Sequence, residues 1–163
     1  MQRLPPRGKI LRRDIGTGEV KAKTMNDFQL KMCDIQGRLF ELSGKNGYDS
    51  TVFIKAFMTG DVAKNLDSVF NRMQWAGEEY LLEEIAATAA LTKGGIVYDK
   101  EVLYWSGYIY RFWHFSTGES SKEIYKQASA QTMNRNWLIF HTLAPEAAIE
   151  DLKEIRRQRQ KRA

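Results

Sequence analysis

Apolar residues separated by three and four positions recur along most of this chain, which is the spacing of one face of an α-helix. The first such stripe consists of Phe28, Met32, Ile35, Leu39 and Leu42. It lies between Asn26, a favoured N-terminal cap, and Gly44, a residue type that commonly ends helices. This pattern predicts a helix from about Asn26 to Ser43.

Similar stripes and boundary residues predict further helices. They cover approximately residues 50–57, 61–66 as one or two turns, a longer helix from Ser68 or Asn71 to about 91, and residues 100–115, 120–127, 132–142 and 145–155. Ser50 and Thr132 are the expected caps of the 50–57 and 132–142 helices, Ser120 and Glu123 form a capping box, and Pro145 suits a first helical turn. Trp75 is expected in the core beside Leu81. We therefore predict a mainly α, single compact domain of about six to eight helices, with at most a small N-terminal β-hairpin around residues 16–18.

The charges divide the chain into an acidic body and two basic ends. Residues 1–24 hold seven basic and two acidic groups, and residues 156–163 hold five basic groups and no acid. Residues 25–155 hold 13 basic and 18 acidic groups. We predict a basic N-terminal arm at 1–24, a helical domain at 25–155 and a basic C-terminal tail at 156–163.

The basic ends could attract a nucleic acid, whereas the acidic body would repel its phosphates. This makes Arg12 and Arg13 candidate nucleic-acid-binding residues of the arm. The corresponding candidates in the tail are Arg156, Arg157 and Arg159.

Cys33 is the only cysteine, so an internal disulfide is impossible and the chain suits a reducing cytosol. We expect Cys33 to be a small buried residue on a helix. The apolar runs are far shorter than the roughly 18 residues of a membrane helix, and residues 1–10 do not resemble a secretory signal. These features predict a cytoplasmic protein that does not insert into a membrane.

The densest feature is the segment 104–115, which contains seven aromatic residues in twelve positions. They cannot all face one core from one helix. Either this helix is buried nearly all round, or part of it forms a binding face. The second alternative makes Tyr104, Tyr108 and Trp113 candidate partner-binding residues, and Gly107 would let another helix approach closely.

Glu78, Glu79, Glu83 and Glu84 form an acidic patch on the predicted 68–91 helix. Paired carboxylates can bind a metal or transfer protons, but no second acidic cluster or histidine is obviously supplied. A solvated face or a docking patch for a basic partner remains, so Glu78, Glu79 and Glu83 are candidate partner-binding residues. No zinc pattern, Ser-His-Asp set or dinucleotide fingerprint occurs, and we expect neither metal nor cofactor.

The best enzymatic hint is the heptapeptide Arg135-Asn-Trp-Leu-Ile-Phe-His141. It resembles the active motif of HEPN-type ribonucleases, which implies that His141 would act as general acid and base while Arg135 stabilises phosphate charge. A regular helix, however, places residues six apart about 120° from alignment. The alternative is that His141 is a hydrogen-bonded structural residue and that the chain holds no catalytic residue.

A longer resemblance covers Tyr104 to Leu152. Its motifs are Tyr110-Arg-Phe-Trp-His-Phe, Thr117-Gly-Glu-Ser-Ser-Lys-Glu-Ile-Tyr and Phe140-His-Thr-Leu-Ala-Pro-Glu. This stretch resembles small uncharacterised bacterial proteins found near mobile elements and toxin–antitoxin loci. The resemblance implies a genomic context and no mechanism.

The leading functional hypothesis is a non-catalytic protein-binding domain, such as a bacterial antitoxin or a phage-type inhibitor of a protein or nucleoprotein partner. It depends on the acidic body, the basic ends and the surplus of aromatic residues. The alternatives are a HEPN-like ribonuclease and a nucleic-acid-binding protein that uses its basic ends. The sequence leaves the identity of the partner and the oligomeric state open.

Overall fold

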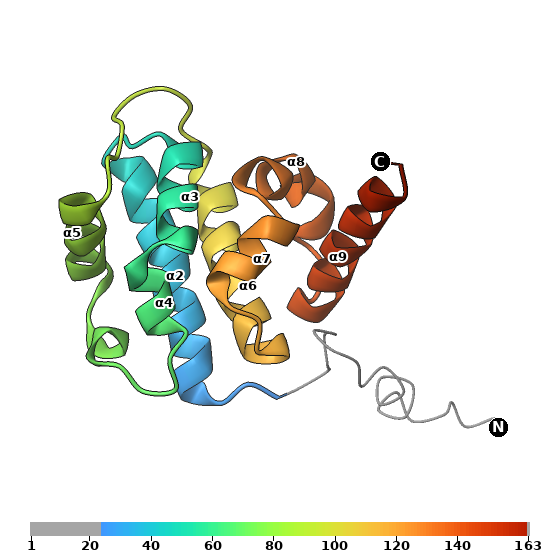
Figure 1. Cartoon of the computed structure of the whole chain (residues 1–163), viewed down its shortest axis with the longest axis horizontal. Helices are drawn as coiled ribbons and strands as arrows, with labels where there is room; N and C mark the ends of the chain where they lie inside the picture. The colour runs from blue at the N-terminus through green and yellow to red at the C-terminus, as the bar shows by residue number, and fades with distance from the viewer. Residues whose placement is uncertain (1–23, 163) are drawn as a thin grey trace.

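Eight α-helices and one short 3₁₀-helix make up residues 24–162, the part of the chain that this computed structural model describes (Figure 1). They are α2 (Asp27–Lys45), α3 (Ser50–Thr59), α4 (Asp61–Leu66), η2 (Arg72–Trp75), α5 (Glu78–Thr88), α6 (Lys100–Thr117), α7 (Ser121–Gln127), α8 (Ala130–Phe140) and α9 (Pro145–Arg162). The predicted mainly α fold is confirmed, and the predicted hairpin around residues 16–18 lies outside the described residues. None of these described helices combines the length and the apolar character that crossing a bilayer requires.

Several predicted helix starts are confirmed. Asn26 caps α2, because its side chain accepts a 2.8 Å hydrogen bond from the Gln29 amide and the Gln29 side chain accepts one from the Asn26 amide. The predicted capping box opens α7, where the Ser120 side chain accepts a 3.1 Å bond from the Glu123 amide. Pro145 is the first residue of α9. Short polar side chains thus set these helix ends, as their capping preferences predict.

Two helices begin with a different cap from the one predicted. Asp49, not Ser50, caps α3 by accepting a 3.1 Å hydrogen bond from the Val52 amide. The second oxygen of the Asp49 carboxylate accepts a hydrogen bond from the Ile96 amide, in the segment before α6. The carboxylate therefore accepts hydrogen bonds from two separate parts of the chain. Likewise Ser129, not Thr132, caps α8.

The helix predicted over residues 68–91 is wrong in its first half. Two extended residues, Ala76 and Gly77, separate η2 from α5. The buried Gln74 side chain donates to the carbonyls of Leu66, the last residue of α4, and Ser68, which holds η2 away from the line of α5. Because the break changes the register, Trp75 is 70% exposed rather than in the core. The apolar residues of α5 are buried as predicted: Leu81, Leu82 and Ile85.

Helices α2 and α6 pack together in the middle of the molecule, with α5 and α9 at its two ends (Figure 1). A Cβ atom at Gly107 would lie 2.4 Å from the Gln36 carbonyl oxygen, far inside van der Waals contact. At Gly37 a Cβ atom would lie 2.9 Å from the Tyr104 carbonyl oxygen. The Gln36 side chain also donates to the Gly107 carbonyl at 3.0 Å. The close approach predicted for Gly107 is therefore confirmed.

Helices α2 and α9 are among those that extend beyond their predicted ends. Helix α2 continues through Gly44 to Lys45, and Asn46 caps it. Helix α9 continues through the predicted tail as far as Arg162, so residues 156–162 are helical. The basic residues of this segment therefore have defined positions on a helix.

Candidate functional site

Helix α6 has one buried side and one partly exposed side. On the buried side, Trp113 is 0% exposed, its indole N–H donates to Glu119 at 3.1 Å, and the Lys153 ammonium lies over its ring at 5.4 Å. The prediction that Trp113 binds a partner is therefore wrong, because α9 contributes the side chain that covers it. On the other side Tyr104 and Tyr108 are half-buried and can still contact a partner.

Tyr104 lies in a surface groove formed by α2, α6 and α8, which we name the aromatic groove. It has a volume of about 530 Å³. The groove is lined by Glu41, Lys100, Glu101, Tyr104, Trp105, Trp137 and His141. The rings of Trp137 and His141 stack with their centroids 4.0 Å apart. Three large aromatic side chains thus meet at one surface beside two carboxylates.

The Tyr104 side chain is held in one position. Its hydroxyl donates a 2.5 Å hydrogen bond to Asp34 of α2, and its ring lies close to Gly37. Burial raises the pKa of Tyr104 above its ordinary value, and the hydrogen bond to Asp34 raises it further. The phenol is therefore a neutral, fixed group at neutral pH.

The acceptor of this hydrogen bond, Asp34, connects the groove with the acidic patch of α5. Arg38 pairs with Asp34 at 3.2 Å and approaches Glu78 at 3.8 Å. The structure thus links Glu78 to the α6 tyrosine through two side chains of α2. Glu79 and Glu83, the other candidate partner-binding residues of the acidic patch, are exposed on α5 and do not line the groove.

Helix α8 exposes apolar residues that were not predicted to form a surface. Leu138 is 73% exposed and Ile139 is 68% exposed, directly after the groove residue Trp137. Phe140, the next residue, is buried. The signal was present in the sequence, because four consecutive apolar residues of a helix cannot all face the core.

Arg135 and His141, the pair that resembles a ribonuclease motif, have different surroundings. The Nδ1 atom of His141 lies 2.7 Å from the Trp137 carbonyl oxygen and 3.1 Å from that of Leu138, so this nitrogen donates to its own helix. His141 lines the aromatic groove, whereas Arg135 is exposed and does not line it. His141 is thus hydrogen-bonded, as the structural alternative expected, but it is exposed. Ribonuclease activity of the pair stays a prediction.

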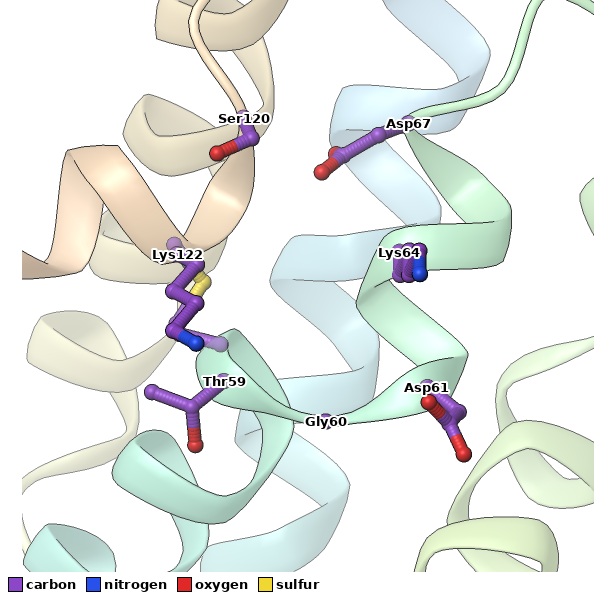
Figure 2. A pocket seen from close by; sticks show the side chains of 8 residues that line it. Thr59, Gly60, Asp61, Lys64, Asp67, Ser120 and Lys122 are labelled. Carbon is purple, nitrogen blue, oxygen red and sulfur yellow. The ribbon is translucent and has the colours of Figure 1, made fainter.

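A second pocket, of about 340 Å³, lies between α4 and α7. It is lined by Met58, Thr59, Gly60, Asp61, Lys64, Asp67, Ser120 and Lys122. Figure 2 shows the Asp67 side chain extending from the end of α4 towards Ser120 at the start of α7. This carboxylate was not predicted as a site residue, since its main partners are distant in the sequence.

Protein groups already occupy the Asp67 carboxylate. Arg111, which is 0% exposed, donates to it at 2.7 Å, and Ser121 donates through its hydroxyl at 2.7 Å and its amide at 2.8 Å. Arg111 also donates from Nε to Gln36 at 2.8 Å. Burial lowers the pKa of Arg111, while the charge of Asp67 opposes that effect. Both carboxylate oxygens serve this cluster, so the pocket fits a structural junction of α2, α4, α6 and α7 better than a catalytic site.

His114 lies beside this cluster. Its Nδ1 atom is 2.6 Å from the Glu119 carbonyl oxygen and 3.7 Å from an oxygen of Asp67. Burial lowers the pKa of His114, and the positive charge of Arg111 lowers it further. The ring is therefore neutral at neutral pH and donates from Nδ1 to the carbonyl.

The predicted nucleic-acid-binding residues divide into two groups. Arg12 and Arg13 lie outside the described residues. Arg156, Arg157 and Arg159 lie on the last turns of α9, where all three reach the solvent.

Residues 24–162 contain no group of three or more His, Cys, Asp and Glu side chains that could hold a metal ion. Cys33 is buried on α2, as predicted, and burial raises the pKa of its thiol to about 12. A thiol with such a pKa is protonated and therefore inert as a nucleophile.

Comparison of the chain with protein-family models, with curated proteins and with solved structures finds no match. A functional proposal for this chain therefore depends on the geometry and charges of its own surfaces.

Proposed function

We propose that this chain is a non-catalytic protein-binding domain whose partner docks in the aromatic groove. The observation that carries the proposal is the meeting of Tyr104, Trp105 and Trp137 at one partly exposed surface. Such side chains bury much area for little loss of conformational entropy and often dominate the energy of an interface. A groove of about 530 Å³ is large enough to receive anchoring side chains of a partner.

The charges at the groove favour a basic partner segment. Glu41 and Glu101 line the groove, with Lys100 as the one cation among its lining residues. The net charge of the whole body is also negative, since residues 25–155 carry 13 basic and 18 acidic groups. Charge complementarity of this kind mainly accelerates association and selects the partner.

The groove is also organised before binding. The Tyr104 hydroxyl is fixed on Asp34, and Trp137 is stacked on His141. Exposed Leu138 adds apolar area directly beside Trp137. Because these rings are already ordered, a partner would lose less free energy in arranging them.

A narrower form of the proposal is that the domain neutralises its partner, as an antitoxin or a phage-type inhibitor does. Its support is the resemblance of residues 104–152 to small bacterial proteins found near mobile elements and toxin–antitoxin loci. The segment that carries this resemblance includes Tyr104, Trp105 and Trp137 of the groove.

Affinity capture from the source cells tests the proposal, with the full chain compared with two single variants. Trp137→Ala removes a groove residue, and Trp75→Ala removes an exposed tryptophan of η2, outside the groove. We expect Trp137→Ala to lose at least about ten-fold in affinity for the captured protein, since a central aromatic residue contributes on the order of 2 kcal/mol or more. Trp75→Ala should bind like the unmodified chain, and melting curves establish that both variants are folded.

The purified partner then allows a second comparison. Glu41→Gln combined with Glu101→Gln should slow association at low salt and make the association rate less dependent on salt. Partner binding that persists in Trp137→Ala and disappears in Trp75→Ala would show that the groove is not the docking site.

A further inference from the structure

The end of α9 is a dense group of cations held against the rest of the fold. Residues 156–162 contain five basic residues and no acid, and all of them are helical. The Arg156 guanidinium donates to the Lys126 carbonyl of α7, and Arg159 donates to the Thr132 hydroxyl of α8 at 3.3 Å. These contacts give the two arginines defined positions beside α7 and α8.

The acceptors of these two arginines are neutral groups. By contrast, Arg157 pairs with Glu154 at 2.8 Å on the same helix. Among the described residues, no carboxylate lies within ion-pair distance of Arg156 or Arg159. Arg156 and Arg159 are therefore held by neutral groups, and no carboxylate within residues 24–162 pairs with either positive charge.

The spacing of the cations suits a ligand with several phosphates. Arg156, Arg159 and Arg162 follow one another at intervals of three, so they form a row that rises about 9 Å along the helix axis and turns about 120° around it, at 1.5 Å and roughly 100° per residue. Lys126 is exposed on α7 next to Arg156 and adds a fourth cation. We name Lys126, Arg156, Arg159 and Arg162 the basic α9 face.

Stabilisation of the helix end does not by itself account for this arrangement. Cations in the last turn do stabilise a helix through its dipole, but this effect is confined to that turn. Arg156 lies earlier in α9 and donates away from its own helix, to α7. A planar guanidinium that is anchored at one edge can still offer its remaining N–H groups to phosphate oxygens.

We propose that the basic α9 face binds the phosphodiester backbone of a nucleic acid. This site is separate from the aromatic groove and does not depend on the proposed protein partner. Contacts made only by arginine and lysine side chains with phosphates carry no base-sequence information, so the binding is sequence-independent. The acidic body directs the nucleic acid to this face, since phosphates are repelled elsewhere on residues 25–155.

Fluorescence anisotropy with the full chain tests this inference. The probes are labelled duplexes and single strands of about 20 nucleotides, in DNA and in RNA, titrated between about 50 and 200 mM salt. We expect affinity to fall linearly on a log–log plot. In the variant Arg156→Gln/Arg159→Gln, the slope for duplex DNA should decrease by about two, at roughly 0.9 per lost phosphate contact. The comparison of DNA with RNA identifies the preferred backbone.

Arg157→Gln is the matched control, because this arginine is already paired with Glu154. Its slope should stay within about half a unit of the unmodified chain, since one compensated charge is removed. Circular dichroism at each salt concentration establishes that the helix of every variant is intact.

Three outcomes would overturn the inference. One is the absence of nucleic-acid binding at the lowest salt concentration. A second is an unchanged slope in Arg156→Gln/Arg159→Gln, with the whole effect appearing in Arg12→Gln/Arg13→Gln instead. The third is binding to vesicles of anionic phospholipid without binding to any oligonucleotide, which would make the face a membrane-surface site.

Discussion

Replacing Asp67 by alanine removes the carboxylate that compensates a fully buried cation. Arg111 is 0% exposed and donates to Asp67 at 2.7 Å, while its other hydrogen-bond partners, Gln36 and Ser121, are neutral. The substitution also removes the acceptor of the Ser121 amide and hydroxyl at the start of α7. One carboxylate therefore supports both a buried charge and a helix end.

The expected loss of stability is large. Removing one partner of a buried ion pair costs about 3–5 kcal/mol, because the remaining charge stays desolvated. The unpaired groups of Ser121 add roughly 1 kcal/mol. Since a domain of this size is stable by about 5–15 kcal/mol, Asp67→Ala should remove about a quarter or more of the free energy of unfolding.

Urea unfolding followed by circular dichroism measures this loss. Asp61→Ala is the matched control, because Asp61 lines the same pocket at the other end of α4 but is exposed. This variant should stay within about 1 kcal/mol of the unmodified chain. The double variant Asp67→Ala/Arg111→Met should recover part of the loss, since it no longer buries an isolated charge. A cost below about 1 kcal/mol for Asp67→Ala, or simple additivity in the cycle, would refute the role assigned to the pair.

Two further predictions concern the interior. Gly107→Ala should destabilise the fold by about 1–3 kcal/mol, because its Cβ atom would lie 2.4 Å from the Gln36 carbonyl oxygen. Gly77→Ala is the control, since the nearest contact of its Cβ atom would be 3.6 Å. It should cost far less in the same urea titration. His114 has a lowered pKa in the folded protein, so the unfolded chain binds more protons below about pH 6.5 and stability should fall as pH decreases from there. His114→Asn should weaken this dependence below about pH 6.5, and an unchanged pH profile of the urea midpoint would contradict the assignment.

Glu119 should affect the free energy of unfolding in a lower pH range than His114 does. Burial alone would raise the pKa of Glu119, but the hydrogen bonds from Lys153, Trp113 and Gln127 together lower it. A carboxyl group with a lowered folded pKa stabilises the fold above its unfolded pKa, and this contribution is lost as pH falls below about 4.5. The histidine and carboxylate effects can therefore be separated in one pH series.

Local chemistry explains which parts of the fold could be predicted. Asn26, Ser120 and Pro145 act on backbone groups within a few residues, so their helices could be placed from the sequence. The break at Ala76–Gly77 could not be predicted, because Gln74 stabilises it by donating to carbonyls at and just after the end of α4. That contact exists only once α4 and η2 are folded together.

The same distinction applies to the sites. The pattern of the aromatic segment predicted that Tyr104 and Tyr108 are partly exposed. The burial of Trp113 depended on Lys153, which lies 40 positions away in the sequence. Arg111 and Asp67 are 44 positions apart, and no residue near either of them in the sequence indicates that they pair. An arginine within an aromatic helix was the available signal, since such a charge must find a partner if the helix is buried.

The two proposed surfaces lie at opposite ends of helix α8. Arg159 of the basic α9 face contacts Thr132 in the first turn of α8, whereas Trp137 and His141 of the aromatic groove lie at its other end. Residues 132 and 141 are separated by about 14 Å along the helix axis, at 1.5 Å per residue. Two macromolecules could therefore bind side by side, with the acidic groove repelling phosphates and the basic face attracting them. A nucleoprotein complex offers a basic protein surface next to a phosphate backbone, so it fits this pair of surfaces better than either component alone.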